Sequence, residues 1–187
     1  MKLNIGCGNK RKEGFVGVDK FPCDAVDTLA DINEALPFES NVVEEIWLDN
    51  VIEHVTDISH LMIEMHRVCQ HGAKISIITP HYTSPSSWRD PTHLHHLSYF
   101  SMDHFEKSDV AHYTGGGYRV VSKKLSFSGG VMGILGRLIF MISPKQYESK
   151  WCFIFRAGTL RFELNVLKNE SDTKHHDQST NREINNA

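Results

Sequence analysis

The sequence predicts an α/β fold: a doubly wound, Rossmann-like sheet that is mostly parallel and ends in an antiparallel C-terminal strand. Three observations predict it. Short apolar runs bounded by glycine and charge recur through the first 80 residues, as buried parallel strands do. One pair of runs is joined by an apolar face at helical spacing, which implies a right-handed crossover. Residues 159–167 alternate apolar and polar side chains, as a half-buried strand does.

The expected parallel strands lie before residue 80, where proline stops the last of them. Glycine turns follow the first strand, and the turn-like "LPFESN" leads into the fourth. The strands are expected at residues 2–5, 15–18, 27–32, 44–48 and 74–78.

One amphipathic helix is expected to begin at Ile58, between the last two of these strands. Thr56 or Asp57 can serve as its N-cap, and Gly72 is the expected C-terminal stop. Its apolar face is formed by Ile58, Leu61, Met62, Met65, Val68 and Cys69.

The C-terminal half is less regular. Residues 81–102 are rich in serine, proline and histidine without a period, and a loop this long in a compact domain is usually functional or disordered. A brief helix at 102–107 and a glycine turn at 115–117 should follow. The two strands at 118–127 and 159–167 should pair as an antiparallel edge.

The length fits one domain, residues 1–167, with an apolar insertion at 128–158. Residues 168–187 are polar and read as a disordered tail. Within the insertion, the run 131–142 contains an arginine and two glycines and is too short to span a bilayer. We expect it to pack within the fold, to contact a second copy of the chain, or to meet a membrane surface or lipid-like substrate.

Charge and cysteine usage narrow the function. A net charge of −3 and a pI near 6.4 argue against nucleic acid bound mainly through its phosphates. The four cysteines form no C-x-x-C pair, which is typical of reduced thiols in the cytoplasm rather than of disulfides or a zinc knuckle. The first residues already read as a strand and a turn, so we expect no signal peptide.

The start of the chain has the features of a nucleotide-binding edge. Gly6 and Gly8 follow the first strand and would let a ligand approach the backbone. Asp19 ends the second strand on the same edge, where it could accept hydrogen bonds from ribose hydroxyls. The dinucleotide fingerprint G-x-G-x-x-G does not fit, because Arg11 occupies its third glycine position. Asp19 also follows the glycines much sooner than the acidic residue of that fingerprint does. These departures disfavour NAD, and the lack of a G-K-[ST] sequence excludes a P-loop.

Four segments in order, "LNIGCGN", "VGVD", "ADINEALPFESNVVEEIWLDNVIEHV" and "MHRVCQHGAKISIITP", resemble the class I S-adenosylmethionine-dependent methyltransferases. The resemblance is strongest to small members associated with polysaccharide and glycan biosynthesis. It covers about residues 2–105 and, more loosely, the final strand. Any one segment is a weak signal, but the four in the correct order are specific.

The resemblance implies S-adenosylmethionine as the cofactor and assigns roles by position. The glycine turn would line the methionine part of the cofactor, and the acid after the second strand would bind the ribose. The residues after the third strand would contact the adenine, and those ending the fourth would border the sulfonium. The expected cofactor residues are Gly6, Cys7, Gly8, Asp19, Lys20, Asp31, Ile32, Asp49 and Asn50.

One departure bears on the cofactor. Only ten residues separate Gly8 from Asp19, so the helix that normally follows the glycine turn should be absent or reduced to a single turn. A more exposed or weaker cofactor site is the expected consequence.

The long loop supplies candidates for the acceptor site. "DPTH", from Asp90 to His93, resembles a motif of the same glycan-associated methyltransferases, and His81 leaves the sheet at the ligand-binding edge. We predict His93, His81 and Asp90 as catalytic, because histidine is the side chain best suited to general base catalysis near neutral pH. Glu53–His54 matches a recurring pair of the family, or simply begins a helix.

Other roles for the loop residues are also consistent with the sequence. Asp90 and His93 could brace the loop, and Tyr82 and Trp88 could stack on a sugar face or merely pack. A metal site of His93, His95 and His96 is also conceivable, although H-x-H-H is no standard zinc spacing, and we assign no metal ligand.

The predicted activity is methyl transfer to oxygen or nitrogen of a small-molecule or glycan acceptor. A methyltransferase-like binding or scaffold protein without catalysis is the alternative, and a metal-dependent hydrolase is a third.

Overall fold

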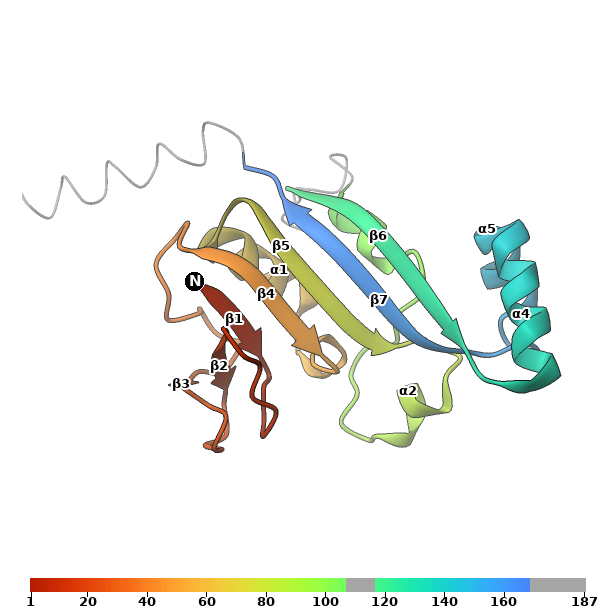
Figure 1. The fold of residues 1–187 in the computed structure, drawn as a ribbon, viewed down its shortest axis with the longest axis horizontal. Coiled ribbons are helices and arrows are strands. Elements are labelled where there is room, and N and C mark those ends of the chain that lie inside the picture. Colours follow the sequence, from red (N-terminus) through yellow and green to blue (C-terminus); the bar gives the residue numbers. More distant parts are fainter. Residues whose placement is uncertain (107–116, 169–187) are drawn as a thin grey trace, which may run out of the picture.

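Seven strands form one twisted sheet in the computed structural model, which describes residues 1–106 and 117–168 (Figure 1). Their order across the sheet is β3-β2-β1-β4-β5-β7-β6. The strands are β1 (Lys2–Ile5), β2 (Val16–Asp19), β3 (Thr28–Leu29), β4 (Val43–Asp49), β5 (Cys69–Pro80), β6 (Tyr118–Phe127) and β7 (Ala157–Val166).

Parallel pairing extends from β3 through β5, and β7 runs antiparallel between β5 and β6. The predicted mostly parallel sheet with an antiparallel C-terminal strand is therefore confirmed. The predicted antiparallel pairing of the last two strands is confirmed as well. The expected strand at 27–32 is only two residues long.

Helix α1 (Ile58–Val68) crosses from β4 to β5 and covers one face of the sheet. Asp57 is its N-cap, because its side chain accepts hydrogen bonds from the Ser59 and His60 amides. The prediction that Gly72 stops the helix was wrong: the helix ends at Val68, and the chain enters β5 directly at Cys69. Gly72 instead takes a φ of 79° within β5, so its glycine signal marks an irregularity in a strand rather than a helix end.

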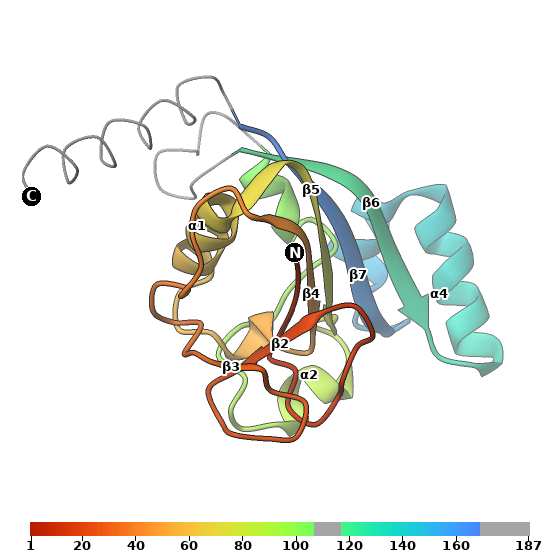
Figure 2. The ribbon, with the colours of Figure 1, turned by 60° about the vertical axis from the view of Figure 1, so that its left-hand side comes forward.

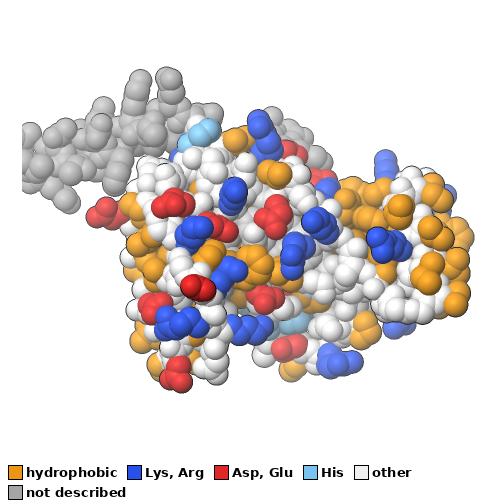
Figure 3. Space-filling view, in the orientation of Figure 1, with side chains coloured by type: hydrophobic (Ala, Val, Ile, Leu, Met, Phe, Trp, Pro, Cys, Tyr) orange, Lys and Arg blue, Asp and Glu red, His pale blue; other side chains and the backbone are white. Residues whose placement is uncertain are grey.

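Helices cover only one face of the sheet in the described residues, as Figures 1 and 2 show. On that face Leu3, Ile46 and Ile75 lie in register and pack in the core with α1. The residues that precede these three in their strands, Lys2, Glu45 and Lys74, are also in register and lie on the other face. Charged side chains spread over this surface in Figure 3. Alternation along each strand thus separates a buried apolar face from a charged one.

The open face results from the short connection between β1 and β2. Residues 6–15 contain turns and no helix, as predicted from the ten-residue gap. This segment lies against the sheet instead, with Lys12 Nζ 4.0 Å from the centre of the Trp47 ring and Asn4 Nδ2 donating to the Lys10 carbonyl. The second helical layer of a doubly wound fold is replaced here by a cation–π contact and a turn.

The connection from β3 to β4 is held by an ion pair on α1. Arg67 contacts Glu64 at 2.8 Å and also donates to the carbonyls of Leu36 and Phe38. The Glu64 carboxylate accepts from the Leu36 amide, and its hydrogen bond with Arg67 lowers the pKa of Glu64 below its ordinary value. This pair fixes the segment that follows Asp31.

The remaining helical pieces follow β5. Helix α2 (Pro85–Arg89) lies inside the segment expected as a loop, and the 3-10 turn η2 (Ser101–Phe105) takes the place of the helix expected at 102–107. The apolar run forms α4 (Gly130–Ile142), followed by α5 (Pro144–Gln146) and the π-turn η4 (Tyr147–Trp151), at the right of Figure 1. Residues 169–187 of the expected tail and residues 115–116 of the expected glycine turn lie outside the described residues. No helix in the described part of the chain is long and apolar enough to cross a membrane.

Candidate active site

A cavity of about 650 Å³ opens at the carboxyl ends of the parallel strands. Ligands of open α/β sheets bind at this edge. The lining residues come from the ends of β1, β2 and β4, the segment after β3, and the loop after β5: Gly6, Asp19, Lys20, Phe21, Ala30, Asp31, Ile32, Asn33, Asn50, Val51, His54, Val55, Thr56, Thr92 and Leu94.

Gly6 begins the cavity wall at a point where only glycine fits. Its φ is 65°, and a Cβ added there would lie 2.3 Å from Val51 Cγ2. Its amide donates to the Val18 carbonyl at 2.8 Å, which ties the turn to β2. The turn therefore brings backbone, rather than a side chain, to the cavity.

Asp19 faces the cavity with both carboxylate oxygens held by backbone. Oδ2 accepts from the Gly8 amide at 2.9 Å, and Oδ1 accepts from the Phe21 amide at 3.0 Å. Each oxygen keeps a second lone pair, so the carboxylate is oriented and can still accept from a ligand hydroxyl.

Asp31 lies on a second wall of the cavity, after β3. Its Oδ1 accepts from the amide and the side chain of Asn33, and the backbone hydrogen bond is the main reason that its pKa is lowered. Asn33 in turn accepts from the amide and the hydroxyl of Thr56 at 2.8 and 2.9 Å. This contact joins the segment after β3 to the one after β4.

The structure brings most, but not all, of the predicted cofactor residues to the cavity. Gly6, Asp19, Lys20, Asp31, Ile32 and Asn50 line it. Cys7 points away: it is buried, its thiol donates to the Ala25 carbonyl, and burial raises its pKa. Gly8 acts through its amide on Asp19, and Asp49 pairs with Lys10 and Asn50 instead.

Several lining residues were not predicted. Phe21, Val51 and Leu94 carry apolar surface, and no local sequence signal distinguishes them from ordinary packing residues. His54 had a signal in the recurring Glu-His pair, but its place at the cavity depends on η1 (Ile52–His54), which turns the chain beneath the loop at 90–97. The Glu53 carbonyl accepts from the amides of Leu94 and His95, which holds that loop in place.

A hydrogen-bonded chain fixes the proton on His54. The Asp90 carboxylate can only accept, so the Thr92 hydroxyl donates to it at 2.7 Å. Thr92 Oγ1 and the Thr92 carbonyl must then accept from His54 Nδ1, at 3.0 and 3.3 Å. Neutral His54 therefore carries its proton on Nδ1 and keeps a lone pair on Nε2. Asp90, predicted as catalytic, is placed as a residue that positions Thr92 and His54.

His93 lies against His54, with the two ring centres 4.6 Å apart in an edge-to-face arrangement. Its Nδ1 bonds to the Ser87 carbonyl of α2 at 3.0 Å. Beneath the pair, Glu53 is fully buried and burial raises its pKa. Two histidines and a carboxyl group thus meet beside the cavity. His95 and His96 do not join them: the His95 amide binds the Glu53 carbonyl, and His96 stacks on Trp88.

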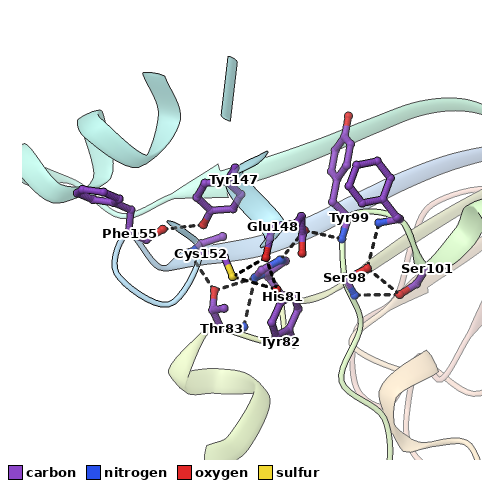
Figure 4. Close-up of polar contacts among 12 residues, drawn as sticks. His81, Tyr82, Thr83, Ser98, Tyr99, Ser101, Tyr147, Glu148, Cys152 and Phe155 are labelled. Carbon is purple, nitrogen blue, oxygen red and sulfur yellow. Dashed lines mark hydrogen bonds and ion pairs between the residues drawn. The ribbon is translucent and has the colours of Figure 1, made fainter. Parts of the chain in front are cut away.

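His81 lies in a different network, shown in Figure 4. It is fully buried, and its Nδ1 accepts from the Thr83 amide, so Nε2 carries the proton and donates to Glu148 at 2.9 Å. Glu148 also accepts from the Tyr99 amide, and Cys152 donates to the Glu148 carbonyl. Both nitrogens of His81 are occupied and the residue is not among those that line the cavity, so this position does not support the catalytic role predicted for it.

Comparison with known proteins agrees with this geometry. Residues 10–77, from the turn after β1 into β5, match the family described as "Methyltransferase domain". No curated protein matches the chain.

Solved structures with the same fold include two described as S-adenosylmethionine-dependent methyltransferases. The one from Archaeoglobus fulgidus is 17% identical with a TM-score of 0.55, over 88% of this chain and 85% of that chain. The one from Mesorhizobium loti is 11% identical with a TM-score of 0.54, over 88% and 89%. A third, described as the [4+2]-cyclase SpnF, is 12% identical with a TM-score of 0.55, over 90% and 74%.

These similarities confirm the predicted fold class, the class I Rossmann-like fold of the methyltransferases. The matched domain indicates S-adenosylmethionine as the cofactor, as the sequence predicted. The cavity fits that molecule, because two oriented carboxylates line it together with the apolar side chains of Ile32, Val51 and Val55. The cyclase shows that the fold alone does not fix the reaction.

Proposed function

We propose that this chain is a methyltransferase that moves a methyl group from S-adenosylmethionine to an oxygen or nitrogen of a small or glycan-type acceptor. The observation that carries the proposal is the single cavity that joins Asp19 and Asp31 to His54. Carboxylates suit the ribose and adenine donors of the cofactor, whereas an imidazole with a free Nε2 suits an acceptor that must lose a proton.

The cofactor supplies a methyl group on a sulfonium sulfur, which keeps the electron pair of the broken C–S bond while the acceptor's lone pair forms the new bond. The protein's part is to place the acceptor in line with that carbon and to take its proton. Asp90 and Thr92 orient His54 for this role through the hydrogen bonds at 2.7 and 3.0 Å. His93 stands beside it.

A glycan acceptor associated with polysaccharide biosynthesis is supported by a second cavity of about 440 Å³ along α2. Trp88 and Phe153 are 64% and 68% exposed there, and Arg89 and Arg156 also line the cavity. Exposed aromatic rings stack on sugar faces, and arginines bind acidic or phosphate substituents. The Ser87 carbonyl of α2 accepts a hydrogen bond from His93, which links this surface to the His54–His93 pair beside the first cavity.

Replacing Asp19 with alanine tests the cofactor assignment. We expect S-adenosylhomocysteine, the demethylated product, to bind the natural chain in titration calorimetry and to bind D19A at least tenfold more weakly, because two charge-assisted hydrogen bonds are lost. D24A is the control, since Asp24 is exposed and does not line the cavity. Absence of both heat and thermal stabilisation at millimolar cofactor would contradict the proposal.

A binding protein without catalysis is separated from an enzyme by turnover. Methyl transfer from radiolabelled S-adenosylmethionine to a panel of sugars and nucleotide sugars would establish the activity. Tight binding of S-adenosylhomocysteine with no transfer across the panel would favour the binding protein.

For the surface of α4 we propose contact with an anionic membrane on the cytoplasmic side. Val131, Met141 and Ile142 are 72%, 69% and 85% exposed, and Gly133 and Gly136 face inward instead. Four basic side chains in the same region are exposed, whereas its one acid, Glu148, turns inward to His81. The basic residues are Arg137, Lys145, Lys150 and Arg156. Apolar residues with a basic surround are typical of interfacial helices.

A vesicle flotation assay tests this membrane contact. We expect the natural chain to bind vesicles that contain about 30% phosphatidylglycerol. The variant M141E/I142E should bind them roughly an order of magnitude more weakly, because a charged side chain cannot enter the acyl region of the bilayer. I63E is the matched control, since Ile63 is exposed on α1. No binding to vesicles, or a stable dimer that M141E/I142E dissociates, would overturn the membrane proposal.

A further inference from the structure

Three side chains that can bind a metal ion converge beside the cofactor cavity. The side chains are those of Glu53, His54 and His93. Each offers one potential metal-ligand atom, and these three atoms all lie within 4.8 Å of one another. Glu53 and His54 come from the turn η1 after β4, and His93 comes from the loop after α2. The two histidines are 39 positions apart in the sequence, so neither segment has a recognisable metal motif by itself.

Both histidines use Nδ1 for a hydrogen bond to the protein, which leaves Nε2 as the nitrogen that could bind a metal. The Nδ1 of His54 bonds to two oxygens of Thr92, and the Nδ1 of His93 bonds to the Ser87 carbonyl. Because a carbonyl oxygen can only accept, the proton of each neutral ring is on Nδ1 and the Nε2 lone pair is available. Metal-binding histidines almost always make such a second hydrogen bond through the nitrogen that does not bind the metal.

Glu53 supplies the independent observation that points to a bound cation. Its side chain is fully buried, and Oε2 accepts from the Thr79 hydroxyl at 3.0 Å. Its Oε1 is buried and has no hydrogen-bond partner in the described residues. A buried carboxylate oxygen without a partner is costly, and a bound cation would compensate it.

We propose that Glu53, His54 and His93 bind a zinc ion. Two imidazoles and one carboxylate form a ligand set that zinc uses in catalytic sites, where a fourth position stays open for water or substrate. Calcium and magnesium are disfavoured because they prefer oxygen ligands only.

The position of the site suggests its use, and this step rests on the proposed methyl transfer. His54 and Thr92 line the cavity that would hold the cofactor, so a metal ion bound by His54 would lie beside that cavity. There the zinc would bind the acceptor through oxygen and lower the pKa of its hydroxyl group. The acceptor class is thus narrowed to hydroxyl compounds. In the zinc-bound chain His54 would be a ligand, and the hydroxyl proton would pass to water in the open cavity instead of to His54.

Zinc titration of the full chain after dialysis against a chelator tests the site. We expect one tightly bound zinc ion per chain and at least tenfold weaker binding by H93Q and E53Q. H96Q is the matched control, because His96 lies in the same loop but stacks on Trp88 outside the cluster. Cobalt replaces zinc as a spectroscopic probe, and its visible absorption should appear in the natural chain and H96Q and be lost in H93Q.

Folding controls make each result of the zinc titration interpretable. Circular dichroism melting of the metal-free variants shows whether they fold. If E53Q does not fold, the zinc affinity of H93Q alone tests the site, because His93 is on a loop and its replacement should leave the fold intact. Failure of the natural chain to bind zinc, or equal affinity of H93Q, would overturn the site. Calorimetry with S-adenosylhomocysteine in the presence of chelator is independent of it, so a failed metal site and a failed cofactor site are distinguishable.

Discussion

Replacement of Gly6 with alanine is expected to reduce affinity for S-adenosylhomocysteine by at least 100-fold. The added Cβ would lie 2.3 Å from Val51 Cγ2, and the backbone φ of 65° is itself unfavourable for alanine. Since Val51 lines the cavity, relief of the clash must move either the turn or the cavity wall. Titration calorimetry measures the loss directly.

G129A is the matched control for this experiment. A Cβ at Gly129 would have no atom within 4 Å, and the residue has a negative φ of −67°. We expect the control to bind as the natural chain does. Undiminished affinity of G6A would show that the glycine turn does not form the cofactor site.

Replacement of Glu148 with alanine is expected to lower the free energy of unfolding by about 3 kcal/mol, since it leaves the buried His81 Nε2–H and the Tyr99 amide without their acceptor. Chemical denaturation followed by circular dichroism measures the change. E39A, which removes an exposed glutamate, should change stability by less than about 0.5 kcal/mol. Equal stability of E148A and the natural chain would contradict the structural role given to His81.

The effect should depend on pH. Burial acts to raise the pKa of Glu148, but hydrogen bonds from His81, the Tyr99 amide and Tyr82 outweigh it and hold the pKa below its ordinary value of 4.5. A carboxyl group with a lowered pKa stabilises the fold fully above its unfolded pKa and loses that contribution as the pH falls through the folded pKa. The difference between E148A and the natural chain should therefore be largest near pH 7 and shrink below pH 4.5.

Local sequence determined the sheet and one side of the cavity. Strand positions follow from apolar runs such as residues 2–5 and 118–127, which are buried or alternate in the structure as their period requires. Gly6, Asp19 and Asp31 could be found because each lies at or just after the end of a strand, and parallel strands bring their carboxyl ends to one edge. The missing first helix was equally predictable, since ten residues cannot form it and return to the sheet.

Tertiary structure decided the acceptor side. His81 and His93 are both loop histidines in sequence, yet one is sealed against Glu148 and the other meets Glu53 and His54. No local pattern distinguishes them, because the partner that decides each environment is distant in sequence: Glu148 lies 67 positions after His81, and His54 lies 39 positions before His93. Short-range periodicity reports which face of an element is buried, whereas hydrogen bonds between distant segments fix which nitrogen of a histidine is free. The sequence alone thus determined the fold and the cofactor edge, and only the packing of the loop at 90–97 onto η1 decided which side chains can act there.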